Sequence, residues 1–297
     1  MSRKVIVQLT VIDISIVHYE HTTVVEPISE SSVIVKYREF FDDIDKEKVE
    51  IYLDLKESDA NASFQLYISE KYPSIQYRKQ DGTPFDYYIH CTIYNSHFPK
   101  LQKEKSNQKY IAHDITERLQ QNPNVFFLTP LAGTKNLISC DILPFMDQKR
   151  KTDIPIYIVQ GGLKNSRRNF TLLRKILSET NCKHPFIIKM VGRGELPDEL
   201  SEYKERIVVK SDLDFIDYHK EFLDGYCILP LTSIHSHPQY YSTKFTSTIN
   251  YAKAYKLKCL LDEDLQKIYG LENAQVYKDE SDIKEAFLQT LSDFYET

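Results

Sequence analysis

The chain has 297 residues, of which 41% are hydrophobic and 27% are charged, and its formal net charge is -5. This length fits one large or two medium domains, and the hydrophobic fraction is enough to build cores and argues against extensive disorder. The small negative charge gives no sign of the basic face by which proteins bind nucleic-acid phosphates, so we expect no nucleic-acid partner.

Cysteine usage and hydropathy set further limits. The five cysteines are scattered and never form a Cys-x-x-Cys pair. That pattern is typical of reduced thiols in a cytoplasmic protein rather than of a disulfide framework or a zinc site. No run approaches the ~20 apolar residues of a membrane span, and the N-terminus lacks the apolar core of a signal peptide. We therefore expect a soluble, cytoplasmic protein without a membrane span.

The first half of the chain alternates strands with helices. Residues 3–17 are rich in β-formers and predict one long strand or two strands joined by a bend, and helical spacing of apolar residues predicts a helix over Ala60–Tyr72. Further strands are expected at Val49–Leu55, Tyr87–Tyr94, Lys109–His113 and Asn124–Thr129. The charged run Asp147–Asp153 has the composition of a linker.

The stretch from Ile154 to Gly194 is the most informative part of the sequence. It predicts a strand, a glycine turn, a basic helix start, a second strand and a second glycine turn, and four of the chain's eight glycines fall in it. Glycine placed after two strands indicates that the backbone must come close to something. The order suits a phosphate-bearing ligand at the carboxyl edge of a parallel sheet.

Strands and helices continue to alternate up to the C-terminus. Strands are expected at Ile156–Val159, Pro185–Val191, Arg206–Lys210, Tyr226–Leu231 and Lys258–Leu261, and helices at Phe170–Leu177, Phe215–Phe222, Thr246–Tyr255 and Ser281–Tyr295. The two halves together predict an α/β protein of two Rossmann-like doubly wound domains facing a cleft. The predicted domains are residues 1–147 and 148–280, with residues 281–297 forming a helix that crosses back to the first domain.

The second half resembles the nucleotide-sugar-binding domain of GT-B glycosyltransferases, and most closely that of retaining glycosyltransferase family 4. The matching series is Gly161–Gly162 before Arg168, the turn Gly192–Gly194, the strand end Lys210–Ser211, the strand Tyr226–Leu231 with its proline, and the turn and helix Tyr240–Ala254. The resemblance covers residues 154 to 265 by motif and the first half by plan only. In character the chain is also similar to glycosyltransferases carried by large DNA viruses.

This resemblance implies a retaining, metal-independent glycosyltransferase, with hexose transfer favoured. It would move a sugar from a nucleotide-sugar donor, GDP-mannose first and a UDP-sugar next, to a glycan, glycoprotein or other hydroxyl acceptor. No cofactor and no metal would be needed, and a homodimer stays open. Two alternatives remain: a non-catalytic nucleotide-sugar-binding module and a GT-B-fold nucleotide-sugar epimerase.

Three residues are the catalytic candidates: His113, Arg168 and Lys244. A departing diphosphate carries several negative charges, which without a metal must be met by cationic side chains and helix N-termini. Arg168 begins a helix, where a positive charge is unfavourable unless an anion is present. Lys244 precedes a helix opened by Thr246–Thr248, whose hydroxyls and amides suit a phosphate. His113 ends a strand, where the family often keeps a histidine near the donor sugar.

The donor-binding candidates surround the same turns: Gly161, Gly162, Lys164, Arg193, Lys210, Ser211, Tyr241, Phe245, Thr246, Ser247, Thr248 and Asn250. Ordinary roles are open for many of them, since a basic helix start can simply be solvated and Ser or Thr is preferred at any N-cap. The family's pair of glutamates falls on Thr243 and Tyr251, so ribose contact would come from Asn250 or Tyr251. The family's N-terminal glycine-rich loop is missing as well, because Val7–Val17 contains no glycine.

Other motifs favour ordinary structural roles. His235 and His237 are metal-ligand types without a third ligand nearby in the sequence, so we expect a loop there. Asp212–Asp214 and Asp262–Asp264 resemble the Asp-x-Asp of metal-dependent glycosyltransferases, but helix capping explains them more simply. The sequence also lacks the signatures of serine hydrolases, phosphate-loop NTPases and dinucleotide-dependent dehydrogenases.

Overall fold

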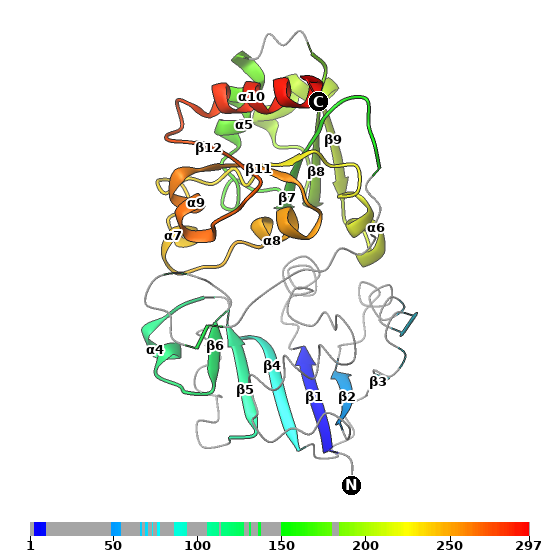
Figure 1. The fold of residues 1–297 in the computed structure, drawn as a ribbon, viewed down its shortest axis with the longest axis vertical. Coiled ribbons are helices and arrows are strands. Elements are labelled where there is room, and N and C mark those ends of the chain that lie inside the picture. The colour runs from blue at the N-terminus through cyan, green and yellow to red at the C-terminus, as the bar shows by residue number, and fades with distance from the viewer. Residues whose placement is uncertain are drawn as a thin grey trace. The chain divides into compact units, whose positions relative to one another are not determined.

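A computed structural model shows two compact α/β units (Figure 1). Residues Met1–Leu143 and Thr243–Phe245 form the first, and residues Pro144–Ser242 and Thr246–Thr297 form the second. The structure describes residues 3–9, 49–54, 66, 69–70, 73, 76–77, 86–93, 106–112, 114–127, 131, 136–137, 150–179 and 184–296. Each unit is built on a six-stranded sheet in which the described neighbouring strands are parallel, as the α/β prediction required.

The sheet of the first unit has the strand order β3-β2-β1-β4-β5-β6. Its strands are β1 (Arg3–Leu9), β2 (Val49–Asp54), β3 (Gln76–Tyr77), β4 (Tyr87–Ile93), β5 (Gln108–Ala112) and β6 (Val125–Phe127). Helix α4 (Glu117–Gln120) begins at Thr116, whose side chain accepts a hydrogen bond from the Leu119 amide. Most of the predicted helix Ala60–Tyr72 and the catalytic candidate His113 lie outside the described residues.

The sheet of the second unit has the order β12-β11-β10-β7-β8-β9. Its strands are β7 (Ile156–Gly162), β8 (Ile187–Arg193), β9 (Ile207–Ser211), β10 (Cys227–Ile228), β11 (Lys258–Asp262) and β12 (Ala274–Tyr277). The helices between and after them are α5 (Phe170–Glu179), the 3-10 helix η3 (Asp198–Arg206), α6 (Phe215–Lys220), α7 (Gln239–Ser242), α8 (Ser247–Ala254), α9 (Glu263–Tyr269) and α10 (Ile283–Glu296). No described helix combines the length and the apolar character needed to cross a membrane.

One large apolar core holds this second unit together. Strand β7 lies at the centre of the sheet, and its residues from Ile156 to Gly161 are all buried, as expected for a parallel strand covered on both faces. Helix α5 adds buried residues at helical spacing, such as Phe170 and Leu173. The predicted strands and helices of this half therefore form around the residues whose spacing indicated them.

Helix α10 packs into the same core, beside α5 (Figure 1). Its residues Ile283, Phe287 and Leu291 are buried, and the Phe287 ring lies 4.4 Å from that of Tyr157 and 5.1 Å from that of Phe186, centroid to centroid. The sequence alone predicts that this helix crosses back to the first domain. In the structure the apolar face of α10 is buried in the core of the second unit.

The two Asp-x-Asp motifs serve as helix starts, as expected. Asp214 is the N-cap of α6 and accepts from the Asp217 amide at 2.8 Å. Asp262 is the N-cap of α9 and accepts from the amides of Asp264 and Leu265, both at 3.0 Å. Each aspartate thereby satisfies first-turn amides that have no partner within the helix.

Candidate functional site

The topology of the second sheet marks one position for a ligand. After β7 the chain builds β8 and β9 on one side, and it then returns to build β10, β11 and β12 on the other. Loops that leave the carboxyl ends of β7 and β10 therefore diverge, and open α/β sheets bind ligands in the crevice at such a switch point. A backbone hydrogen bond joins the two loops, where the Asn169 amide donates to the Leu231 carbonyl at 2.6 Å.

Two glycines let the ends of β7 and β8 come unusually close. Gly161 and Gly192 are paired in the sheet, and a Cβ atom on Gly192 would lie 1.8 Å from the Gly161 carbonyl oxygen. Gly161 has a φ of +104°, and a Cβ atom there would lie 2.6 Å from Nη2 of Arg168. The sequence predicts that the backbone at these glycines comes close to another group, in a layout that suits a phosphate-bearing ligand. Contacts within the protein already require glycine at both positions, because the two residues approach each other closely and Gly161 also approaches the Arg168 guanidinium.

Arg168 is the centre of a buried hydrogen-bond network. Its side chain is 5% exposed. Nε donates to the Gln160 carbonyl at 2.9 Å, Nη1 to the Arg167 carbonyl at 2.7 Å, and Nη2 to Oγ1 of Thr248 at 3.1 Å. Thr248 in turn donates to Oε1 of Gln160 at 2.9 Å, and the Gln160 amide nitrogen donates to the Tyr218 hydroxyl at 2.9 Å. The guanidinium therefore joins the end of β7, the start of α5 and the start of α8.

The start of α8 presents backbone amides at this same position. Thr246 is the N-cap, and its side chain makes no capping hydrogen bond with any described residue. No acidic side chain stands in the first turn, so the positive end of the helix dipole is not offset locally. The predicted donor residues Thr246, Ser247, Thr248 and Asn250 are all buried here. Thr248 differs from the expectation in one respect, because its hydroxyl bonds to Gln160 and Arg168.

The remaining edge candidates follow the carboxyl ends of β7, β8 and β9. Gly162 pairs with Arg193 and Gly192 with Ser211 in the sheet, so these residues share one edge. Arg193 is exposed, and Lys164 is exposed on the loop after β7. The side chain of Lys210, next to Ser211, lies with its ammonium 4.0 Å from the Glu221 carboxylate. The structure thus brings these residues to the edge that carries Arg168.

A buried histidine fixes the loop that carries Lys164. His237 is 2% exposed; its Nδ1 lies 2.8 Å from the Ser236 hydroxyl and its Nε2 lies 3.2 Å from the Asn165 carbonyl. Burial lowers the pKa of His237, and the charges of Arg168 and Arg167 lower it further. A neutral imidazole therefore connects the loop after β10 to the loop after β7. Sequence reasoning had treated His237 only as a residue of the former loop.

Three further candidates are Tyr241, Lys244 and Phe245. The Tyr241 hydroxyl donates to Asp262, the residue that caps α9. Burial raises the pKa of both groups, so the tyrosine stays protonated and keeps this bond. Lys244 and Phe245 group with the first unit, where the Lys244 ammonium lies 3.7 Å from the Asp114 carboxylate. Tyr241 therefore helps to hold the start of α9, and Lys244 and Phe245 belong to the unit that does not contain Arg168.

The position of the family's second glutamate belongs to the core. Tyr251 is 0% exposed, its ring stacks on Phe222 at 4.7 Å, and it meets Tyr218 edge to face at 5.8 Å. Tyr255 stacks on the same phenylalanine at 5.1 Å. The expectation that Tyr251 contacts a ribose is therefore wrong, because its ring fills the space beneath α8. Residue type alone could not separate these two roles.

Comparisons with known proteins identify the fold. The sequence matches no protein-family model and no curated protein. The structure is similar to a lipopolysaccharide outer core galactosyltransferase, WaaB, at 12% identity and a TM-score of 0.51, over 98% of this chain and 91% of that one. It is also similar to sucrose-phosphate synthase from Thermosynechococcus elongatus, at 12% identity and a TM-score of 0.50, over 98% and 90% of the two chains. This chain has the GT-B fold.

The GT-B prediction is thereby confirmed at the level of architecture. A UDP-N-acetylglucosamine 2-epimerase is similar at 10% identity with a TM-score of 0.49, over 100% of this chain and 89% of that one, a likeness too low to favour the epimerase alternative. Similarity at such identities concerns the fold, and function must be argued from the site. Within the described residues, no cluster of three or more His, Cys, Asp or Glu side chains could hold a metal ion.

Proposed function

We propose that this chain is a glycosyltransferase that moves a sugar from a nucleotide-sugar donor to a hydroxyl group of a glycan or glycoprotein acceptor. The observation that carries the proposal is the edge formed by Gly161, Arg168 and the start of α8 at the switch point between β7 and β10. The fold shared with a galactosyltransferase and a sucrose-phosphate synthase, over nearly the whole of each chain, supports it.

The donor diphosphate would be held by dipoles and cations. First-turn amides of α8 point out of the helix N-terminus and suit a phosphate oxygen. The exposed side chains of Lys164 and Arg193 can reach an anion from the neighbouring loops at the same edge. Arg168 would act from beneath, because its hydrogen bonds to Gln160 and Thr248 fix α8 against β7 while its charge stays close to the diphosphate. No metal ion is needed in this arrangement.

The proposed reaction retains the anomeric configuration. The bond between the sugar C1 and the diphosphate oxygen breaks, and the acceptor oxygen bonds to C1 on the same face. The proton of the acceptor hydroxyl passes to the departing diphosphate, so no enzyme nucleophile takes part. GDP-mannose is the favoured donor and a UDP-sugar the next. Lys244 and His113 stay candidates for contacts with the donor.

A second candidate function is a non-catalytic nucleotide-sugar-binding module. One observation favours it: the two positions of the family's glutamates hold Thr243 and Tyr251, and the latter is enclosed by aromatic rings. A module of this kind would bind the donor through the same edge and would leave it intact. Both functions therefore require that the donor binds, and they differ in whether the donor is turned over.

Titration calorimetry on the full chain, in EDTA, tests both. GDP-mannose, UDP-glucose, UDP-xylose and UDP-N-acetylglucosamine are titrated separately, and each bound donor is then followed for hydrolysis. Lys164→Glu is expected to weaken donor binding, whereas Lys253→Glu, an equally exposed lysine near the other end of α8, is expected to leave it unchanged. Binding with slow hydrolysis supports the glycosyltransferase, and binding without turnover supports the module. An epimerised sugar, or no binding at all, overturns both.

A further inference from the structure

A cavity lies at the opposite end of the strands of the same sheet, beside their amino-terminal ends. Its volume is about 550 Å³, and it is lined by the residues that precede β7, β10, β11 and β12 and by the end of α10. The proposed donor site lies at the carboxyl ends of the strands, and the five residues of β11 alone span about 16 Å. A ligand in this cavity is therefore not the donor discussed above.

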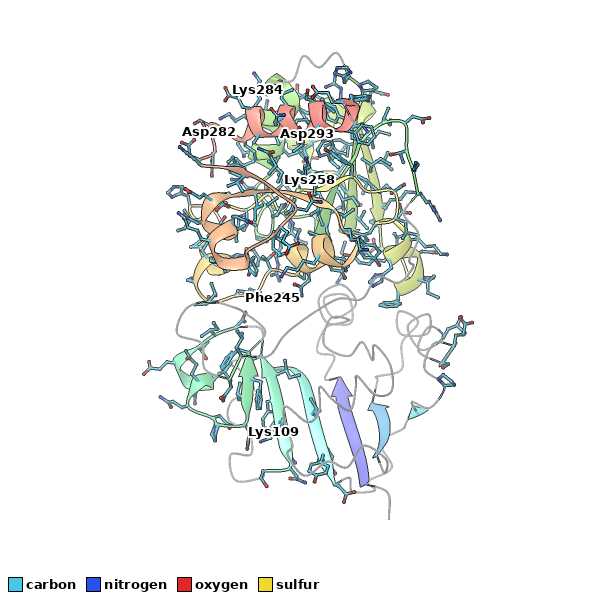
Figure 2. All side chains as sticks on the ribbon, viewed as in Figure 1. Lys109, Phe245, Lys258, Asp282, Lys284 and Asp293 are labelled. Carbon is cyan, nitrogen blue, oxygen red and sulfur yellow. The ribbon has the colours of Figure 1, made fainter. Side chains whose placement is uncertain are left out.

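Positive charge predominates in the lining. Four cationic side chains, those of Arg150, Lys151, Lys256 and Lys258, stand against the carboxylates of Asp224 and Asp293. Lys258 binds Asp293 at 2.5 Å, and Figure 2 marks this pair on β11 and α10. Asp224 is bound at 2.6 Å by the buried Lys189, which lies outside the lining. Both carboxylates are thus engaged by lysines, and the cavity suits an anion.

The cavity also has an aromatic wall. The rings of Tyr226 and Phe294 meet edge to face with their centroids 5.0 Å apart. The Tyr226 hydroxyl donates to the Thr290 carbonyl at 2.8 Å, which fixes the ring, and the Lys258 ammonium lies 5.8 Å from the ring centroid. An apolar wall beside cationic groups fits a ligand with a ring at one end and a charge at the other.

We propose that this cavity binds a small organic phosphate of the size of a sugar phosphate. Its volume lies within the range of small-molecule sites, about 300 to 1,000 Å³. Arginine and lysine are the side chains that recognise phosphate groups, and here Arg150 and Lys151 stand before β7 while Lys256 stands before β11. The phosphate lies among these three cations, and the ring packs on Tyr226 and Phe294.

Calorimetry with glucose 6-phosphate tests the proposal, with glucose as the neutral control ligand. The double variant Lys151→Glu/Lys256→Glu is expected to bind glucose 6-phosphate about tenfold more weakly or worse, because both reversed charges face the phosphate. The control is Lys204→Glu/Lys253→Glu, which makes the same change of charge at two exposed lysines outside the cavity. Its affinity is expected to match that of the original chain, and glucose is expected not to bind.

Competition with GDP distinguishes this cavity from the proposed donor site. Saturating GDP is expected to leave the affinity for glucose 6-phosphate unchanged. Displacement by GDP, equal affinity in both double variants, or no binding to the original chain overturns the proposal. The test does not depend on the proposed glycosyltransferase activity, since a chain that fails to bind any nucleotide sugar can still bind glucose 6-phosphate here. Circular dichroism establishes that each variant is folded before it is titrated.

Discussion

Arg168 hydrogen-bonds to Gln160, Arg167 and Thr248, and removing it tests the site directly. In Arg168→Ala the Gln160 carbonyl and the Thr248 hydroxyl lose a buried donor, while α8 stays joined to β7 by the hydrogen bond from Thr248 to Gln160. We expect the affinity for the nucleotide-sugar donor to fall by about 1.5–3 kcal/mol, the range for a hydrogen bond to a charged group. Arg168→Lys should recover only part, because an ammonium keeps the charge without the planar fork of donors. Calorimetry with the best donor measures both.

Arg174 supplies the control for this experiment. It lies on the exposed face of α5, 3.4 Å from Glu202, with both side chains 56% exposed. An exposed pair of this kind contributes at most about 1 kcal/mol to stability and has no access to the donor edge. Arg174→Ala is therefore expected to bind the donor normally. A folded Arg168→Ala protein with the same affinity would remove Arg168 from the site.

The glycines at the strand ends allow a matched comparison. Gly192→Ala places a Cβ atom 1.8 Å from the Gly161 carbonyl oxygen, so β7 and β8 must separate. We expect a loss of about 3 kcal/mol or more in the free energy of unfolding, measured in urea. In Gly162→Ala the added Cβ atom meets the Arg167 side chain, with Cγ at 3.4 Å and Cβ at 3.9 Å, which are ordinary contacts, and stability should change by less than about 1 kcal/mol. Equal effects would show that the two strand ends are not in close contact.

At the scale of elements, two neighbouring positions on α10 show how much this C-terminal helix contributes to the core of the second unit. Phe287 is 0% exposed among Tyr157 and Phe186, whereas its neighbour Leu288 is 36% exposed. Phe287→Ala is expected to lower the free energy of unfolding by about 3–5 kcal/mol, and Leu288→Ala by less than about 1 kcal/mol. Urea denaturation followed by circular dichroism measures both. Similar small effects would mean that α10 contributes little to this core.

The same elements show what the sequence could predict. Strands such as β7 and helices such as α5 and α10 follow from continuous or periodic apolar residues, which need no knowledge of distant partners. Strand β12 was not predicted, because its four residues are mostly part-exposed and it forms only by pairing with β11. A short edge strand of this kind carries little periodic signal.

The residues of the candidate site likewise fall into those that the sequence indicates and those whose roles only the structure shows. Arg168 and the start of α8 could be named as candidates because basic residues and hydroxyls at helix starts have a local physical meaning. Gln160 and Tyr218 were missed, because their roles depend on one hydrogen bond between residues 58 positions apart. Tyr251 was misassigned for a related reason, since only packing places its ring in the core.

At the scale of the whole molecule, the fold restricts the possible reactions less than the chemical groups at the carboxyl ends of the second sheet do. The galactosyltransferase and the sucrose-phosphate synthase named above share 12% identity with this chain, and the likeness concerns the arrangement of strands and helices. Proteins of one fold carry different activities, so the choice of reaction has to come from the groups at the edge. In the proposed function those groups are amide dipoles and cations, which would stabilise a departing diphosphate without a metal ion.

Metal independence is therefore the property of the whole protein that follows most directly from the proposal. Donor hydrolysis by the full chain in EDTA should proceed within about twofold of its rate in Mg²⁺, because the charge on the diphosphate is met by α8 and the neighbouring cations. Turnover of GDP-mannose and UDP-sugars, followed by release of the diphosphate, measures both rates. Lys253→Glu serves as the control, since its charge lies outside the proposed edge. A rate that collapses in EDTA and returns with Mg²⁺ would mean that a divalent ion, rather than this edge, supports the departing diphosphate.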